Sequence, residues 1–244
     1  MVIAVGKIHR VIRETGGRLV VAVDAPTIDL QQLSSFLDNV PEGVVGVKIG
    51  LPYLIHYGIR QMRNLISNYP KLYFIADLKL SDIGDIMALS AKEALNTGFN
   101  GIVAHAFTGL SGALDKLEKV VHEAGADLIL QVTMSHAGAA HTFDRVYGAI
   151  KEIINGVNAD ALIIPANKAQ VITDVRKAFG MKHVILSPGI MIRGVSPGEA
   201  ICAGADAEIV GRAVFDTRDP IAAAKDILKM QEEYLRKHKE SCLK

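Results

Sequence analysis

The chain has 244 residues, of which 50% are hydrophobic and 22% charged, and its formal net charge is +1. This length allows one large core, and the near-neutral charge excludes the basic surface that is typical of nucleic-acid-binding proteins. No apolar run approaches the roughly 18 residues that a membrane-spanning helix needs. Only two cysteines, Cys202 and Cys242, are present, which favours a reducing compartment over a disulfide framework. The apolar start of the chain is too short for a secretory signal, so we expect a cytoplasmic protein that binds neither nucleic acid nor membranes.

Eight short apolar runs, rich in Val, Ile and Leu, recur along the chain at intervals of about 27 residues. They do not alternate strictly between apolar and polar residues, which is typical of strands buried on both faces of a parallel sheet. The predicted strands are Leu19–Asp24, Val44–Ile49, Leu72–Asp77, Gly101–His105, Leu128–Thr133, Ala161–Pro165, His183–Ser187 and Ala207–Gly211.

The segments between these strands have helical periodicity. In the first of them, Asp29–Asn39, apolar residues recur at intervals of three and four, and Pro41 follows its end. The others are Leu54–Ser67, Gly84–Asn96, Leu110–Glu123, Phe143–Gly156, Lys168–Phe179, Ser196–Ala203 and Pro220–Lys237. Eight strand–helix units predict an α/β fold of the (β/α)₈ TIM-barrel type; the alternative is a doubly wound sheet, which usually has fewer units.

No linker or low-complexity tract interrupts this pattern, so we expect residues 1–244 to form a single domain. Residues 1–17 would be a short segment at the bottom of the barrel, with a helix over residues 7–16, and residues 238–244 a polar tail. In such a barrel the active site lies at the carboxyl ends of the strands. The polar residues predicted there are Asp24, Lys48, Asp77, Lys79, Asp82, His105, Thr133, Ser135, Ser187 and the Gly211–Arg212 pair.

The strongest signal among them is a D-x-K-x-x-D element at residues 77–82. Asp77 and Lys79 are two residues apart, so on a continuing extended chain both side chains face the barrel mouth. Neighbouring carboxylates keep a lysine in its ammonium form, which makes Lys79 a proton donor. The alternative is a salt bridge at a strand end, with Ser81 or Asp82 as the N-cap of the next helix.

Lys48 ends the second predicted strand, inside the apolar run Gly46–Gly50. It is well placed to meet Asp77 on the neighbouring strand. Together with Lys79 and Asp82, this pair would form a network in which two cations balance two anions in a water-poor site. The alternative is a lysine with a buried stem and an ammonium group that reaches solvent.

A phosphate site is indicated after the last two predicted strands. Barrels commonly bind phosphate between these two loops, and here the loops contain Pro188-Gly189 and Gly211-Arg212. Gly211 would let backbone N–H groups approach the anion, and Arg212 offers two parallel donors. The alternative is a surface arginine that follows a strand-ending glycine.

A weaker candidate is Ser135, in the segment Met134–Gly138 after the fifth predicted strand. Its hydroxyl and the loop amides could contact the edge of a heterocycle. His136 fits a hydrogen-bonded turn as well as a catalytic role, and His105 fits a core histidine better than a functional one.

These motifs, in this order, resemble those of the orotidine 5′-monophosphate decarboxylases, particularly the short archaeal type, from about residue 18 to 220. The matching positions are Asp24, Lys48, Asp77-x-Lys79-x-x-Asp82-Ile83, Met134-Ser135-His136, Ser187-Pro188-Gly189 and Val210-Gly211-Arg212. The D-x-K-x-x-D element is shared with a wider suprafamily. Lys48 separates the branches, since sugar-phosphate members such as hexulose-phosphate synthase have a carboxylate there for magnesium.

The resemblance implies a (β/α)₈ barrel that acts as a homodimer and converts orotidine 5′-monophosphate to uridine 5′-monophosphate, the last step of de novo pyrimidine synthesis, with no cofactor and no metal. Lys48, Asp77, Lys79 and Asp82 would form the charged tetrad, with Asp82 and Ile83 reaching into the partner's site. Lys79 would stabilise the C6 carbanion and protonate it. The alternatives are a metal-dependent sugar-phosphate decarboxylase or aldolase of the same suprafamily, and a non-catalytic nucleotide-binding barrel.

The resemblance also implies the residues that bind substrate. They are Asp24 for the ribose, Ser135 for the pyrimidine, and Pro188, Gly189, Gly211 and Arg212 around the phosphate. The loop Ile190–Pro197 would be a lid.

Three positions depart from the family pattern: Gly84 replaces a proline, Ile86 a threonine and Arg193 a lid glutamine. They put the ribose contacts and the lid in question, not the reaction. We expect Arg193 to turn toward the phosphate; the alternative is a solvent-facing side chain.

Overall fold

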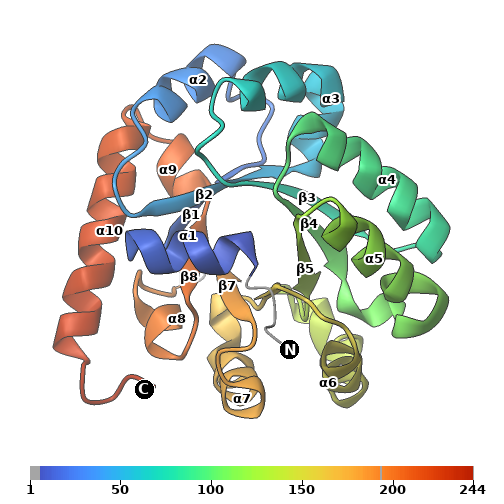
Figure 1. Cartoon of the computed structure of the whole chain (residues 1–244). Helices are drawn as coiled ribbons and strands as arrows, with labels where there is room; N and C mark the ends of the chain where they lie inside the picture. The colour runs from blue at the N-terminus through green and yellow to red at the C-terminus, as the bar shows by residue number, and fades with distance from the viewer. Residues whose placement is uncertain (1–5, 193, 244) are drawn as a thin grey trace.

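The computed structural model describes residues 6–192 and 194–243. Eight parallel strands form a closed barrel in which each strand pairs with the next and the last with the first (Figure 1). They are β1 (Leu19–Val23), β2 (Val44–Gly50), β3 (Phe74–Leu80), β4 (Gly101–His105), β5 (Asp127–Gln131), β6 (Ala161–Ile163), β7 (Val184–Pro188) and β8 (Ala207–Val210). The predicted (β/α)₈ barrel is therefore confirmed, and every predicted strand overlaps an observed one.

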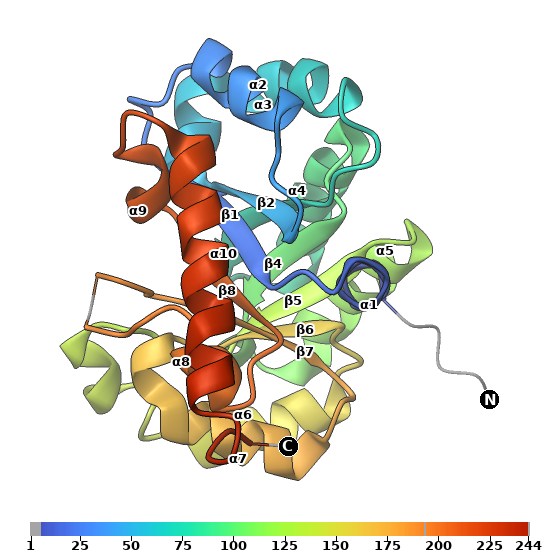
Figure 2. The same ribbon diagram turned by 90° about the vertical axis from the view of Figure 1, so that its left-hand side faces the viewer.

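Helices surround the barrel (Figures 1 and 2). They are α1 (Lys7–Thr15), α2 (Leu30–Asp38), α3 (Leu51–Ser67), α4 (Gly84–Thr97), α5 (Asp115–Glu123), α6 (Tyr147–Gly156), α7 (Ala169–Phe179), α8 (Glu199–Cys202), α9 (Arg212–Phe215) and α10 (Pro220–Lys237). The regular part of α5 begins later than predicted, because Gly112 has a φ of +73° that interrupts the helix. The short helix α9 was not predicted. Among the described residues, no helix combines the length and the apolar character required to cross a membrane.

The strands have apolar side chains on both faces, and these form two separate clusters. Alternate residues such as Val20, Ile75 and Ile209 fill the barrel interior, whereas Val21 and Val210 pack against the surrounding helices. This two-sided burial explains why the strands read as continuous apolar runs in the sequence.

Helix α1 closes the amino-terminal end of the barrel, as predicted (Figure 1). Its Ile8 is fully buried in the interior cluster. The carboxylate of Asp127, at the start of β5, accepts the N–H groups of Lys7 at 2.8 Å and Ile8 at 2.7 Å, and the hydroxyl of Tyr73 at 2.6 Å. With that end closed, the opposite end of the barrel remains for substrate.

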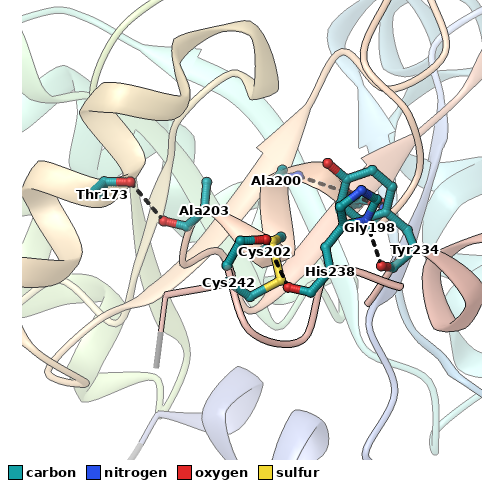
Figure 3. Close-up of a disulfide and its surroundings, with 10 residues drawn as sticks. Thr173, Gly198, Ala200, Cys202, Ala203, Tyr234, His238 and Cys242 are labelled. Atoms are coloured by element: carbon teal, nitrogen blue, oxygen red, sulfur yellow. Dashed lines mark hydrogen bonds between the residues drawn. A yellow bond between two sulfur atoms is a disulfide. The ribbon is translucent and has the colours of Figure 1, made fainter. Parts of the chain in front are cut away.

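The expectation that the two cysteines do not form a disulfide framework was wrong. Cys202, the last residue of α8, forms a disulfide with Cys242 in the carboxyl-terminal tail (Figure 3). The N–H of Leu243 also donates to the carbonyl of Cys202 at 2.8 Å. The tail is therefore fastened to α8, although the two cysteines are 40 residues apart in sequence.

Candidate active site

A cavity of about 400 Å³ opens at the carboxyl ends of the strands. It is lined by nine of the predicted site residues: Asp24, Lys48, Asp77, Lys79, Ser135, Pro188, Gly189, Gly211 and Arg212. Apolar side chains such as Ile163, Ile190 and Ile209 complete the walls. The cavity therefore combines a charged floor with apolar sides, as small-molecule sites commonly do.

The charged residues form a continuous chain of ion pairs across β1, β2 and β3. The ammonium group of Lys48 lies 2.9 Å from a carboxylate oxygen of Asp24 and 2.8 Å from one of Asp77. Lys79 binds the same Asp77 carboxylate at 2.7 Å. Gly50 makes this arrangement possible, because a side chain at this position would occupy the space of the Asp24 carboxylate.

The network holds its buried members in their charged forms. Burial acts to lower the pKa of Lys48, but Asp77 and Asp24 outweigh this effect and raise it. Burial likewise acts to raise the pKa of Asp77, but Lys48 and Lys79 together lower it. Lys48 and Asp77 are only 6% and 5% exposed, so each charge depends on its partners.

Lys79 reaches Asp77 through an unusual backbone conformation. Its φ is +46°, in the left-handed region that costs a non-glycine residue about 1–3 kcal/mol. The pairing of β3 with β4 shifts register between Ala76 and Leu80 at the same place. The prediction that both side chains face the cavity holds, but the chain between them is not regularly extended. Strained backbone of this kind persists where the surrounding contacts enforce it, often at functional sites.

Asp82 and Ile83 lie outside the cavity. Asp82 is exposed and accepts the N–H of Ile83 at 2.7 Å, and Ile83 is 63% exposed. Within one chain, the ion pairs link Asp24, Lys48, Asp77 and Lys79, and Asp82 is not among them.

The opposite side of the cavity is formed by the ends of β7 and β8. Pro188 ends β7 and Gly189 begins the β7–α8 loop. Gly211 precedes α9, whose first residue is the exposed Arg212. These four residues are brought together as predicted. Arg193, which we expected on the same loop, lies outside the residues that the structure describes.

The loop that carries Ser135 is held by contacts that the sequence did not reveal. Thr133 donates to Asp144 at 2.9 Å, and Lys168 forms an ion pair with the same carboxylate. Asn167 donates to the carbonyl of Ser135 at 3.1 Å. No local motif could have indicated these contacts, because the partners come from different loops.

Gln131 was also missed. It is buried at the end of β5, lines the cavity and donates to the carbonyl of Thr133 at 2.5 Å. A polar residue within an apolar strand was the available signal.

His105 packs against the rings of Phe107 and Phe143, as a core histidine does. Burial, aided by nearby Lys79, lowers its pKa.

Two of the departures from the family pattern can be seen in the structure. A Cβ at Gly84 would lie 2.8 Å from the carbonyl oxygens of Gly112 and Ala113, so a proline does not fit against this backbone. Ile86, two residues further into α4, is 44% exposed and lies outside the cavity.

The comparisons agree with this geometry. The Orotidine 5′-phosphate decarboxylase / HUMPS family matches residues 17–227. An orotidine 5′-phosphate decarboxylase of Saccharolobus solfataricus is 34% identical over 222 residues, which cover 91% of this chain and 95% of that protein. One from Aeropyrum pernix is 37% identical over 217 residues, 86% of each protein. The crystal structure of orotidine 5′-monophosphate decarboxylase from Sulfolobus solfataricus has a TM-score of 0.80 and 32% identity, and the match covers 90% of this chain and 99% of that one. The chain therefore belongs to the Orotidine 5′-phosphate decarboxylase / HUMPS family.

Proposed function

We propose that this protein is a carboxy-lyase that converts orotidine 5′-monophosphate to uridine 5′-monophosphate, the last step of de novo pyrimidine synthesis. The observation that carries the proposal is the chain of ion pairs from Asp24 through Lys48 and Asp77 to Lys79 at the floor of the cavity. It places a fixed ammonium group beside a buried carboxylate, which is the arrangement that this decarboxylation requires.

The chemistry follows from the substrate. Loss of CO₂ from C6 leaves an electron pair on a vinyl carbon that has no conjugated electron sink. The ammonium group of Lys79 stabilises that charge electrostatically and then transfers a proton to C6. Asp77 lies beside Lys79 and adds negative charge where the carboxylate of the substrate is lost, so that departure of CO₂ relieves repulsion.

The remaining cavity residues bind the nucleotide. Asp24 accepts hydrogen bonds from the ribose hydroxyls, and Ser135 contacts the pyrimidine. Arg212 and the N–H of Gly211, opposite Pro188-Gly189, hold the phosphate. The phosphate lies away from the reacting carbon, so its binding energy serves to position the base against Lys79.

Lys48 supports a reaction without a metal. Its ammonium group lies between the carboxylates of Asp24 and Asp77, the oxygens that would otherwise suit a divalent cation. A sugar-phosphate lyase of the same family would need that place for magnesium. We therefore propose that neither a metal nor a cofactor takes part.

We also propose that the protein is a homodimer with shared active sites. The exposed Asp82 is followed by exposed apolar residues at the N-cap and in the first turns of α4: Ile83, Ile86 and Leu89, of which Ile83 and Leu89 are more than 60% exposed. Such exposed apolar residues favour burial against a second copy. Asp82 would then complete the partner's charge network beside Lys79.

A cytoplasmic location remains part of the proposal. Disulfides are rare in cytosolic proteins except in hyperthermophiles, so the Cys202–Cys242 disulfide fits this location only in a host of that kind.

The direct test is the loss of orotidine 5′-monophosphate absorbance with purified protein, with and without EDTA. We expect equal rates in both. A rate that EDTA abolishes and magnesium restores would favour a sugar-phosphate lyase, and no turnover of this nucleotide would contradict the proposal.

Shared sites can be tested by mixing two inactive variants, Lys79→Ala and Asp82→Ala. Subunit exchange should restore activity, because each mixed dimer contains one site with both native residues and one site with neither. If exchange is confirmed and no activity returns, the sites are not shared.

A further inference from the structure

Glu208 is a buried acid that the proposed reaction does not use. It lies in the middle of β8 and is 0% exposed. Its neighbours Ala207 and Ile209 point into the barrel, so Glu208 points outward, into the layer that contains α8 and α10. Burial of a carboxylate is costly unless hydrogen bonds compensate for the lost water.

The carboxylate is surrounded by neutral donors. The N–H of Gly198 lies 2.9 and 3.0 Å from its two oxygens, the N–H of Ala200 lies 3.2 Å from one, and the side chain of Gln231 donates to the other at 2.8 Å. Burial raises the pKa of Glu208, and these hydrogen bonds only partly oppose the shift. Among the residues that the structure describes, no cation pairs with this carboxylate, and its hydrogen bonds serve to hold backbone.

The backbone that it holds is the far end of the β7–α8 loop. This loop begins at Gly189, which lines the cavity, and ends at Gly198, the N-cap of α8. Between them Ile190 and Val195 are buried, and Ile192 lines the cavity. The loop is thus part of the cavity wall, and its two ends have different anchors.

Gly198 is fixed from both sides. Its φ is +93°, and a Cβ there would lie 2.8 Å from the Cβ of Tyr234 on α10. Glu208 therefore holds Gly198 against α10 while belonging to the strand that leads to Gly211 and Arg212. One rigid strand connects the end of the loop to the residues proposed to bind phosphate.

We propose that Glu208 is a positioning residue for phosphate binding: it fixes the carboxyl-side end of the β7–α8 loop relative to Gly211 and Arg212. The inference rests on the proposed function, because the phosphate in question is that of orotidine 5′-monophosphate. Without Glu208, part of the phosphate binding energy is used to order the loop, and less of it remains for positioning the base.

This role has a signature that a purely structural role lacks. Loss of Glu208 should lower kcat/KM for the nucleotide and leave kcat/KM for orotidine, the same substrate without its phosphate, almost unchanged. A general loss of folded protein or a distorted floor would lower turnover of both substrates by the same factor.

The variants are Glu208→Ala and Glu208→Gln. Glutamine keeps one oxygen that can accept from Gly198 and Ala200, so it should restore most of the function. Asp206→Asn is the matched control. Asp206 also holds backbone, accepting from Ile185 at 2.7 Å, and forms an ion pair with Arg176, but it directly precedes β8 and does not line the cavity.

The experiment measures kcat/KM for orotidine 5′-monophosphate and for orotidine in all four proteins. We expect Glu208→Ala to lower the value for the nucleotide at least tenfold and that for orotidine less than threefold. Glu208→Gln should stay within threefold of wild type on both substrates, and Asp206→Asn should change their ratio less than twofold.

Equal losses on both substrates in Glu208→Ala, or no loss on the nucleotide, would overturn the inference and leave the proposed function intact. A wild-type protein that does not turn over the nucleotide would instead overturn the proposed function. If Glu208→Ala does not fold, Gly198→Ala displaces the same end of the loop from the side of Tyr234. It must show the same selective loss for the inference to stand.

Discussion

Replacing Lys48 with methionine removes the central cation of the charge network and keeps a side chain of similar length. Lys48 is 6% exposed, and its ammonium group lies 2.9 Å from Asp24 and 2.8 Å from Asp77. Removing one partner of a buried ion pair typically costs about 3–5 kcal/mol, because the other charge is left without compensation. Lys79 still pairs with Asp77, so we expect the free energy of unfolding to fall by about 3 kcal/mol, the lower end of this range.

The effect of Lys48→Met on the free energy of unfolding should depend on pH in a defined direction. In the wild type the pKa of Asp77 lies below its ordinary 3.8, so its stabilisation is present above pH 3.8 and disappears as the pH falls through the folded-state value. The pKa of Lys48 lies above its ordinary 10.5, so its stabilisation is present below that pH and is lost as the pH rises through the folded-state value. Lys48→Met should remove the contribution of Lys48 to the loss of stability at alkaline pH and shift the loss at acid pH to higher pH, since Asp77 has one cation fewer.

Urea unfolding from acid to alkaline pH measures both effects. The matched control is Lys151→Met, which removes the partially exposed ion pair of Lys151 with Asp174 at 3.1 Å. Exposed pairs contribute about 0–1 kcal/mol, so this control should remain close to wild type. If Lys48→Met is no less stable than Lys151→Met at pH 7, or if its acid loss does not move, the charge network does not have the energetics that we infer.

Two further predictions concern the phosphate site and the disulfide. Arg212→Ala should lower kcat/KM for orotidine 5′-monophosphate at least about tenfold, because a charge-assisted hydrogen bond contributes about 1.5–3 kcal/mol; kinetics equal to wild type would place the phosphate elsewhere. Reducing the Cys202–Cys242 disulfide, which closes a 40-residue separation, should lower the free energy of unfolding by about 4 kcal/mol in the chain-entropy model. Cys242→Ser should show the same loss and no further response to reductant; a Cys242→Ser protein as stable as the oxidised wild type would refute this.

The sequence predicted the barrel well, because strands buried on both faces produce apolar runs that need no tertiary information to recognise. It also predicted most of the cavity, since residues such as Lys48, Asp77 and Arg212 stand at strand ends that the fold brings together. The left-handed conformation of Lys79 was not predictable, because a lysine has no preference for it and only its surroundings impose it.

Other features depend on contacts between distant segments. The pairing of Cys202 with Cys242 requires the tail to return to α8, which neither segment indicates by itself. Glu208 was passed over as one polar residue in a predicted strand. Its significance appears only when the N–H groups of the loop are seen around it. A lone acid within a two-sided apolar strand is nevertheless a signal that sequence reasoning can use.

The central claim is that the ammonium group of Lys79 carries the decarboxylation, and Lys79→Ala tests it most directly. In two separate reactions, an excess of wild-type protein or of the variant is mixed with orotidine 5′-monophosphate in the presence of EDTA. The formation of uridine 5′-monophosphate is followed in a single turnover. Binding of uridine 5′-monophosphate, measured separately by calorimetry, shows whether the variant keeps an intact site. We predict complete conversion by the wild type, and no detectable conversion by a variant that still binds the product. A Lys79→Ala protein that retains more than a few per cent of the wild-type rate would contradict the account.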